Sequence, residues 1–301
     1  MRDVTDQEMR PSLRVGVVGA GRVGSVLGAA LREAGHSVVA TSAVSDASLD
    51  RAAEMLPGVP VVEVDEVVRR SDLVLVTVPD DQIASVAEGF AAMGLLDQPR
   101  MVAHAAGSLG LAPLAPVLER GGLGFALHPA MTFSGEPKDV ERLVGTIFAV
   151  TATDESLAVA QSIVMDLGGE PVVLPEGDRV TYHAALAHAS NHAVTLVAQA
   201  QQVLRGLGID DPGRVLRPIM EATVDNALQR GDRALTGPVA RGDVGTVAAH
   251  LAALRDETVD VPAAYRAMAR ATAERAIARR TVPAELVGEL LDLLGEDVRP
   301  E

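Results

Sequence analysis

The chain has 301 residues, of which 48% are hydrophobic and 22% are charged. A chain of this length and composition buries a sizeable core and is long enough for two domains. The formal net charge of -15 argues against broad binding to nucleic acid or to an anionic membrane, because both need a positive field. We therefore expect neither partner, and any anionic ligand must be held by a local site.

Two residue types narrow the chemistry. The sequence has no cysteine, so disulfides, thiolate metal ligands and thiol nucleophiles are excluded. Lys138 is the only lysine, so a lysine acid or a Schiff base would depend on it alone. Residues 1–12 lack the apolar core of a signal peptide, and no later stretch approaches about 20 uninterrupted apolar residues. We expect a cytoplasmic protein with a flexible tail over residues 1–12.

Short β-branched runs alternate with helical or loop segments between residues 13 and 178. Near-continuous apolar strands separated by helices are typical of a parallel sheet covered on both faces. We therefore predict an α/β domain over residues 13–178, with a doubly wound, mostly parallel Rossmann sheet. The predicted strands are LRVGVVG (13–19), HSVVAT (36–41), VPVVEV (59–64), SDLVLVTV (71–78), RMVAHA (100–105), GLGFALHP (122–129), GTIFAVT (145–151) and PVVLP (171–175).

The pattern changes from residue 179 onward. Ala- and Leu-rich segments follow with helical periodicity and with Gly or Pro at their ends. Residues 179–301 are therefore predicted to form an all-α domain, suited to substrate binding and to dimerisation. The predicted helices include residues 181–208, 215–231, 245–257 and 261–280.

The first predicted strand runs into Gly19-x-Gly21-x-x-Gly24. In a dinucleotide-binding turn the first glycine permits the tight turn, the second lets the backbone approach a pyrophosphate, and the third allows close helix packing. The N–H groups at the start of the next helix then face the phosphates. The flanking strand and helix fit this pattern, so we predict that the turn binds a nicotinamide dinucleotide through Gly19, Ala20, Gly21, Arg22, Val23 and Gly24.

The end of the second predicted strand bears on the choice between NADP and NAD. An acidic residue about 20 positions after the first glycine binds the ribose of NAD, but here the chain reads Ala-Thr41-Ser42-Ala. Thr41, Ser42 and Ser45 can instead donate hydrogen bonds to a 2′-phosphate, and Arg22 adds positive charge. We predict that NADP (NADPH) is preferred, with NAD as a possible cofactor.

The segment SDLVLVTVPDDQI places three more residues at the end of a strand, on the side where open α/β sheets bind ligands. Val78, Pro79 and Asp80 are expected to lie near the ribose or the nicotinamide. Asp80 or Asp81 could also cap the following helix, and the two roles are compatible.

Several histidines fall where a substrate would lie. His104 and His128 are at predicted strand ends, so both are expected to line the substrate site together with Ser108. His183 and Asn191 are eight residues apart on one predicted helix, about 80° around its axis, and can face the same cleft. His188 and His192 have the spacing of a metal pair but lack further ligands, so no metal site is predicted.

The chain resembles the two-domain NAD(P)-binding family with a Rossmann-like N-terminal half and a C-terminal domain of unknown function 2520. The resemblance rests on motifs that occur here in order over nearly the whole chain: VGVVGAGRVG, SDLVLVTVPDDQI, HAAGS, HPAMTF, YHAALAHASNH and ALTGPVARGDVGTVAAHL. Part of this family is associated with an alternative type of ketopantoate reductase, which reduces 2-dehydropantoate with NADPH. In the standard ketopantoate reductases, the position corresponding to His183 is a catalytic lysine, so their mechanism does not transfer directly.

We therefore predict an NADPH-dependent oxidoreductase that reduces a small carbonyl compound, a 2-oxo acid such as 2-dehydropantoate. His183 would donate the proton, since histidine changes charge near neutral pH, and Asn191 would orient the carbonyl. Arg241, in ALTGPVARGD, would bind a carboxylate, unless it only stabilises its own turn with Asp243. The alternatives are a dinucleotide-binding sensor or partner protein without turnover, and an imine or pyrroline-carboxylate reductase. Close packing of Ala-rich helices also predicts a homodimer.

Overall fold

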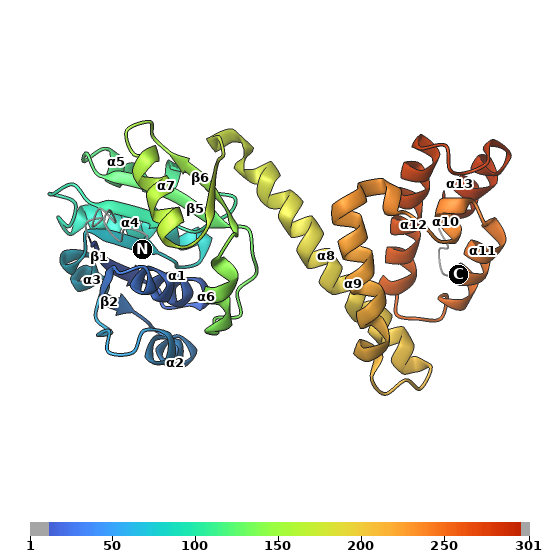
Figure 1. The fold of residues 1–301 in the computed structure, drawn as a ribbon, viewed down its shortest axis with the longest axis horizontal. Coiled ribbons are helices and arrows are strands. Elements are labelled where there is room, and N and C mark those ends of the chain that lie inside the picture. Colours follow the sequence, from blue (N-terminus) through green and yellow to red (C-terminus); the bar gives the residue numbers. More distant parts are fainter. Residues whose placement is uncertain (1–11, 296–301) are drawn as a thin grey trace, which may run out of the picture. The chain divides into compact units, whose positions relative to one another are not determined.

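The computed structural model describes residues 12–295 (Figure 1). The tail predicted over residues 1–12 therefore lies, apart from Ser12, outside the described residues. The chain divides into two compact units, residues 1–187 and 188–301, whereas the sequence places the division after residue 178. The difference arises because α8 (Arg179–Gly206) is one continuous helix whose first residue is fully buried. No helix in the described part of the chain is long and apolar enough to cross a membrane.

The first unit contains a seven-stranded sheet in the order β2-β1-β3-β4-β5-β6-β7. All neighbouring strands are parallel except β5 and β6, which are antiparallel. The predicted fold, a mostly parallel Rossmann sheet followed by a helical region, is confirmed. The strands are β1 (Arg14–Val18), β2 (Ser37–Ser42), β3 (Leu73–Val76), β4 (Met101–His104), β5 (Leu123–Pro129), β6 (Ile147–Ala152) and β7 (Glu170–Val173).

One predicted strand, residues 59–64, is wrong. The segment touches the sheet only through a single bridge between Val61 and Thr41 and then enters α3 at Val64. Pro60 has no N–H to give to a ladder, which confines it to sheet edges and turns. The β-branched residues of this segment thus pass along the end of β2 without extending the sheet.

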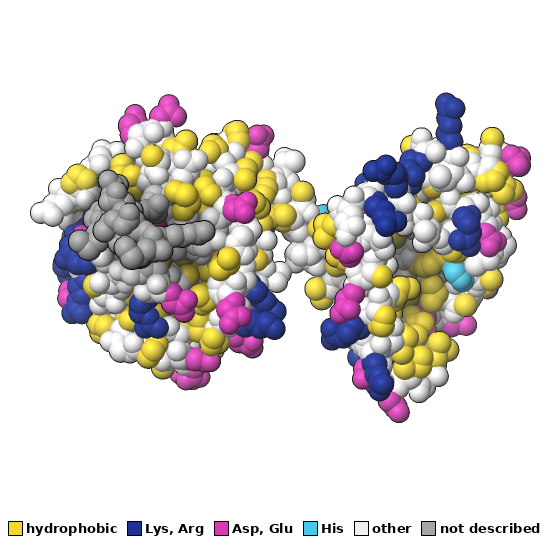
Figure 2. Space-filling view, viewed as in Figure 1, with side chains coloured by type: hydrophobic (Ala, Val, Ile, Leu, Met, Phe, Trp, Pro, Cys, Tyr) yellow, Lys and Arg dark blue, Asp and Glu magenta, His cyan; other side chains and the backbone are white. Residues whose placement is uncertain are grey.

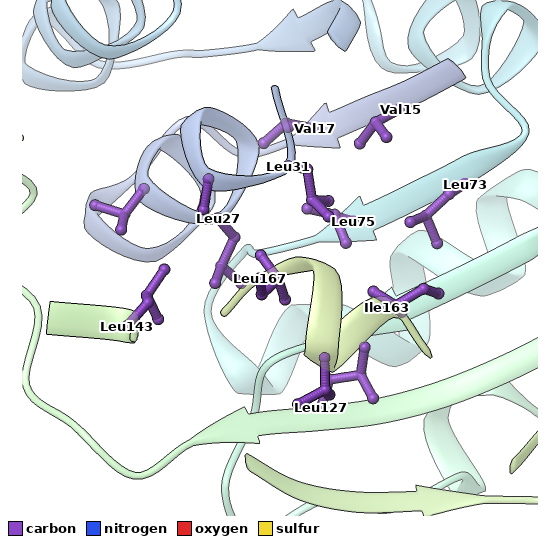
Figure 3. Close-up of a cluster of buried hydrophobic side chains, with 14 of the residues drawn as sticks. Val15, Val17, Leu27, Leu31, Leu73, Leu75, Leu127, Leu143, Ile163 and Leu167 are labelled. Carbon is purple, nitrogen blue, oxygen red and sulfur yellow. The ribbon is translucent and has the colours of Figure 1, made fainter. Parts of the chain in front are cut away.

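Helices cover both faces of the sheet, as continuous apolar strands require. In β3, Leu73 and Leu75 pack into one buried cluster, and Val74 and Val76 pack into the other. Figure 3 shows the first cluster, in which Leu27 and Ile163 approach the strands from two helices. The first face carries α1 (Arg22–Glu33), α2 (Asp46–Met55), α6 (Lys138–Leu143) and α7 (Leu157–Asp166), and the second carries α3 (Val64–Arg70), α4 (Ile83–Ala92) and α5 (Ala115–Leu118).

A buried arginine joins several parts of the first unit. The side chain of Arg179 is fully buried, and its guanidinium donates to Ala126 O (2.8 Å) and Ala149 O (3.0 Å) on β5 and β6. It also donates to Thr151 Oγ1 (2.8 Å) and to Ala106 O (3.1 Å) in the loop after β4. Burial lowers the pKa of Arg179 to about 10, so it remains charged at neutral pH. One side chain therefore fixes two strands and a loop to the start of α8.

The second unit is helical, as predicted, and has a small core of its own. Val247, Ala273 and Leu290 are fully buried or nearly so, and they come from three different helices. The elements that follow α8 are α9 (Pro212–Arg230), η4 (Gly231–Ala234), α10 (Pro238–Arg241), α11 (Val244–Ala253), α12 (Asp260–Ala278), η5 (Ala284–Leu286) and α13 (Val287–Gly295). The core draws on α10 to α13, so α8 and α9 contribute little to it.

Helices α8 and α9 leave large apolar side chains open to solvent. The buried residues among the described ones are Arg179 in α8 and Pro212 in α9. Val194, Ile219 and Leu228 are 71%, 62% and 83% exposed, and hydrophobic side chains lie open on the second unit in Figure 2. Helices of this length normally gain their stability by burying an apolar face, so these faces suit a protein partner.

The buried guanidinium predicts a large stability effect. Replacing Arg179 with methionine keeps much of the volume but leaves the carbonyls of Ala106, Ala126 and Ala149 without this donor. We expect the free energy of unfolding to fall by about 2–4 kcal/mol, measured by urea denaturation. Arg205→Met, on the exposed end of the same helix, is the control and should change it by less than about 0.5 kcal/mol. Equal small effects for both variants would contradict this account.

We propose that a second copy of the chain covers the apolar faces of α8 and α9, giving the predicted homodimer, because symmetric dimers are the commonest oligomers. Light scattering coupled to size-exclusion chromatography should give twice the 31.2 kDa chain mass. Ile219→Glu together with Leu228→Glu should shift the mass to that of one chain. A wild-type mass of one chain at about 50 μM would refute the proposal.

Candidate functional site

The glycine turn lies at the point where the strand order changes direction. Strand β1 has β2 on one side and β3 on the other, and open α/β sheets bind ligands at such a point, beyond the carboxyl ends of the strands. Thr77, which follows β3, donates from Oγ1 to Gly19 O at 2.7 Å and to Val18 O at 3.2 Å. The ends of β1 and β3 are thereby tied together beneath the turn.

Each glycine of the turn has a different reason to lack a side chain. Gly19 has φ +94°, a left-handed conformation that favours glycine. A Cβ on Gly24 would lie 2.2 Å from Thr77 Oγ1 and 2.3 Å from Gly19 O, so α1 could not pack so close to β1. A Cβ on Gly21 would meet no atom nearer than 4.0 Å, so this glycine leaves open space on the loop, into which a ligand can approach the backbone.

The start of α1 has the features of a phosphate site. The N-cap residue is Gly21, no side chain caps the helix, and its first turn carries no acidic residue. Ser25 N donates back to Gly21 O, while no side chain accepts from the N–H groups of residues 22–24 within the described chain. Unsatisfied N–H groups and the helix dipole together favour an anion. The turn therefore fits the pyrophosphate of a dinucleotide.

The hydroxyls expected to bind a 2′-phosphate have partners within the protein. Thr41 is fully buried and donates to Val17 O at 3.1 Å. Ser42 is 8% exposed, and its Oγ accepts from Gly19 N at 3.1 Å. Ser45 is exposed but forms a capping box with Ser48 at the start of α2. The assignment of Thr41 as a direct ligand is therefore corrected, because its one hydroxyl proton is donated to Val17 O. Ser42 supports the glycine turn by accepting from Gly19 N.

Residues 78–80 lie beside the turn. Val78 packs against Gly19, since a Cβ there would lie 3.3 Å from Val78 Cγ1. Pro79 and Asp80 are exposed, and Asp80 begins the short helix η1 (Asp80–Gln82). Neither Asp80 nor Asp81 caps a helix: the N-cap residues are Pro79 for η1 and Gln82 for α4, and neither has a side-chain capping bond. The capping alternative is therefore wrong.

Two of the predicted histidines meet at the same edge of the sheet. His128 is near the end of β5 and His183 is in the first turns of α8, and their rings lie edge to face with centroids 5.9 Å apart. Gly107 lies against both, because a Cβ there would be 2.4 Å from His183 Cδ2 and 2.9 Å from His128 Nε2. Ser108, the next residue, is half-buried. We refer to Gly107, His128, Tyr182 and His183 as the histidine cluster.

His104 has a different position from the one expected. It is 1% exposed, its Nε2 lies 2.7 Å from Gly110 O, and its Nδ1 accepts from Ala106 N at 3.2 Å. Both ring nitrogens are thus used to shape residues 105–111, the loop after β4. Glu176 holds the same loop by accepting from Leu111 N at 2.7 Å. His104 therefore positions the loop and is not exposed to touch a substrate.

The surroundings keep His128 neutral. Burial above all, together with the electrostatic influence of the neighbouring His183 and Arg179, lowers the pKa of His128 to about 4. The hydroxyl of Tyr182 lies 3.3 Å from His128 Nδ1, and burial raises the pKa of Tyr182 above its ordinary value. A neutral imidazole next to a protonated phenol can accept a hydrogen bond from it, so Tyr182 orients the ring of His128.

The remaining two predicted residues belong to the second unit. Asn191 lies on α8, exposed, and accepts from Ser190 Oγ at 3.4 Å. Arg241 ends the short helix α10, which replaces part of the predicted loop and is anchored by the buried Val239 and Ala240. Asp243 bonds Thr246 and caps α11, and the nearby charge of Arg241 helps to lower its pKa after the hydrogen bonds from Thr246. Within the described residues, the side chain of Arg241 makes no hydrogen bond and no ion pair.

Sequence reasoning missed three residues of this region. Tyr182 could have been found, because it directly precedes His183 and has one of the few aromatic rings in the chain. Glu176 and Arg179 gave no such signal, since charged residues in a first helical turn are ordinarily exposed. Their roles depend on contacts with residues about 70 positions away along the chain.

Two family models match the chain in succession, and the second match begins within the sheet of the first unit. Residues 2–129 match the model of a Rossmann-like domain, and residues 146–272 match the model of a domain of unknown function 2520. The predicted combination of these two domains is confirmed. No curated protein sequence matches the chain.

Solved structures share the fold at low sequence identity. A Bacteroides fragilis protein with a proposed NADP oxidoreductase activity is 22% identical, with a TM-score of 0.72 over 87% of this chain and 98% of its own. An imine reductase from Pseudomonas sp. is 18% identical, with a TM-score of 0.60 over 94% and 100%. A pyrroline-5-carboxylate reductase from Coxiella burnetii is 15% identical, with a TM-score of 0.55 over 87% and 99%. At these identities the likeness concerns the fold.

The two neutral histidines predict an acid-labile fold. Burial above all lowers the pKa of His104, like that of His128, from 6.5 to about 4. Between these values the unfolded chain binds protons that the folded chain does not, so the free energy of unfolding must fall as the pH falls from 6.5 to 4. His104→Gln should reduce this loss by on the order of 2 kcal/mol, measured by urea denaturation over this range. His250→Gln, on the second unit, should keep the wild-type slope, and identical slopes for both variants would overturn the assignment.

Proposed function

We propose that the protein is an NADPH-dependent reductase of a small carbonyl or imine compound. The observation that carries the proposal is that a phosphate-binding glycine turn and a cluster of two histidines lie at the carboxyl edge of one sheet. Strands β4 and β5, which lead to the cluster, are the second and third strands from β1 on the side of β3. A dinucleotide held by its pyrophosphate at β1 can extend along this edge.

Each part of the proposed site has a separate role in binding or in the reaction. Gly21 and the start of α1 would hold the pyrophosphate of a bound dinucleotide, and Val78 and Pro79 would contact its ribose or nicotinamide. When bound, NADPH would supply a hydride to the carbon of the substrate double bond and would itself become NADP⁺. His183 supplies the proton to the oxygen or nitrogen, so that a carbonyl becomes an alcohol and an imine becomes an amine.

The proton is assigned to His183 because the other histidines of this edge do not fit. His104 has both ring nitrogens occupied, and His128 is neutral at pH 7 because its pKa is lowered to about 4. His183 contacts Gly107 and His128 by its ring, while no hydrogen bond occupies its nitrogens within the described residues. Positioned proton donation by such a group is worth about 10²- to 10⁴-fold in rate.

The substrate is narrowed by two observations. The similar structures include enzymes that act on imines and on pyrroline carboxylate, which favours a C=N substrate as the second candidate beside a 2-oxo acid such as 2-dehydropantoate. The guanidinium of Arg241 makes no hydrogen bond within the described residues, and a planar guanidinium is suited to bind a carboxylate with two hydrogen bonds, which favours a substrate that carries one.

A sensor that binds the dinucleotide without turnover would need the glycine turn but not the cluster. The close fit of Gly107 against two imidazoles favours an enzyme, because a ligand-binding role alone does not require a proton source. The two functions are distinguished by screening the purified chain with NADPH against 2-dehydropantoate, other 2-oxo acids, aldehydes and cyclic imines.

The proposed role of His183 gives a direct test. With the best substrate of that screen, His183→Gln should lower kcat at least about tenfold, because the proton source is lost. The dissociation constant of NADPH should change little, since the glycine turn is intact. His188→Gln, the same change five residues further along α8, should leave kcat near the wild-type value. An unaffected kcat in His183→Gln would remove this residue from proton transfer, and NADPH binding without any oxidation would favour the sensor.

A further inference from the structure

The 2′-phosphate of NADPH needs positive charge at the end of β2, and the hydroxyls there do not provide it. Thr41 and Ser42 are bonded within the protein, and Ser45 caps its own helix. The N-terminus of α2 is not a phosphate site either, because the Ser45 side chain already accepts a hydrogen bond from Ser48 N there and the acidic Asp46 lies in the first turn. A site for a phosphate dianion must therefore come from other residues.

Two arginines, from the helices that follow β1 and β2, contact one position of the loop before α6. Arg22 is the first residue of α1, directly after the glycine turn, and Arg51 lies on α2. Both contact the same backbone position, because a Cβ on Gly135 would lie 3.1 Å from Arg22 Cγ and 3.0 Å from Arg51 Cδ. Neither guanidinium has a hydrogen bond or ion pair within residues 12–295. The stems of the two side chains are thus packed while their charged heads are left without protein partners.

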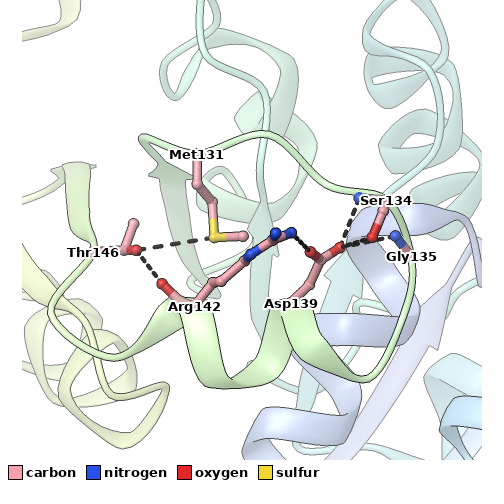
Figure 4. A network of polar contacts seen from close by, with 6 residues as sticks. All are labelled: Met131, Ser134, Gly135, Asp139, Arg142 and Thr146. Atoms are coloured by element: carbon pink, nitrogen blue, oxygen red, sulfur yellow. Dashed lines mark hydrogen bonds and ion pairs between the residues drawn. The ribbon is translucent and has the colours of Figure 1, made fainter. Parts of the chain in front are cut away.

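The segment that packs against them is held rigidly. Asp139 on α6 is fully buried, and its Oδ2 accepts from Ser134 N (2.6 Å), Ser134 Oγ (3.0 Å) and Gly135 N (2.9 Å). Its Oδ1 accepts from Arg142 at 2.9 Å, as Figure 4 shows. Burial alone would raise the pKa of Asp139, but these hydrogen bonds lower it below its ordinary value, so it remains ionised. The turn at Ser134 and Gly135 is therefore fixed by its own carboxylate.

Gly135 could not be replaced without disturbing the arginines. Its φ is +85°, a conformation that other residues rarely adopt. A side chain there would press on the stem of Arg51 and on the backbone of Arg22. The loop of residues 131–137 thus brings its bare backbone against both arginines, on the first face of the sheet.

The carboxylates nearest in sequence do not neutralise Arg51. Asp46, Asp50 and Glu54 on the same helix are exposed, and their spacing of four residues places them on one stripe. Arg51 is turned about 100° from the middle of that stripe and is half-buried. Glu136 beside Gly135 is exposed.

We infer that Arg22 and Arg51, supported by the loop of residues 131–137, form the site that selects NADPH over NADH by binding the 2′-phosphate of its adenosine. This inference rests on the proposed function, since it assumes that a dinucleotide occupies the glycine turn. It adds Arg51, Gly135 and Asp139 to the cofactor site and replaces Thr41 and Ser42 as the source of specificity. Arginine is suited to this role because its planar fork binds phosphate oxygens in pairs.

The test is the dissociation constant of NADPH and of NADH, measured by nicotinamide fluorescence on the full chain. Arg51→Ala should raise the constant for NADPH about tenfold or more, the size expected for a lost charge-assisted hydrogen bond. It should leave the constant for NADH within about twofold. Arg120→Ala, a surface change beyond α5, is the matched control and should alter neither constant.

A second variant tests the supporting loop. Gly135→Ala should weaken the binding of NADPH more than the binding of NADH. If Gly135→Ala does not fold, Arg51→Lys replaces it, and its affinity for NADPH should lie between those of the wild type and Arg51→Ala. If the wild type binds both cofactors and Arg51→Ala changes the two constants equally or not at all, the inference is wrong. If the wild type binds neither cofactor, the proposed function fails and the inference fails with it.

Discussion

The site depends on a buried positive charge that is satisfied by backbone carbonyls and by one hydroxyl, Thr151 Oγ1. Arg179 has no ion-pair partner among the described residues, and its guanidinium is instead shared by carbonyls of β5, β6 and the loop after β4. A buried charge is costly unless it is fully hydrogen-bonded, so the segments that contribute these acceptors are constrained to meet. The start of α8 is thereby placed on the loop that carries Gly107, which brings His183 to His128. The charge also helps to keep His104 and His128 neutral.

At the glycine turn, by contrast, backbone groups of the same sheet edge are left without protein partners among the described residues. No side chain fills the turn at Gly19 and Gly21, and the first N–H groups of α1 have no side-chain acceptor within the described residues. Thr77 supports this turn from beneath, through the backbone of Gly19. One end of the edge is thus open backbone that attracts an anion, and the other end is a packed group of imidazoles that can handle a proton. A hydride-transferring cofactor needs both kinds of environment.

The sequence predicts most of this fold because buried parallel strands and the glycine turn have strong local patterns. Its error at residues 59–64 has a local cause, since β-branched residues outweighed Pro60, which cannot donate to a ladder. The site was harder to predict. His183 and His128 are suggested by their places at the ends of elements, but whether a polar side chain faces a ligand or the protein depends on tertiary contacts. Thr41 and Arg51 show this, because the hydroxyl of Thr41 is buried and the guanidinium of Arg51 has no hydrogen bond or ion pair among residues 12–295.

The central claim is that the dinucleotide and the histidine cluster occupy one site. It is tested most directly by histidine NMR of the isotope-labelled protein during titration with NADPH. The account predicts that the imidazole signals of His183 and His128 shift in step with cofactor saturation, while those of His36, on the opposite edge of the sheet, stay in place. Saturation with NADPH that leaves the signals of His183 and His128 unchanged would contradict it.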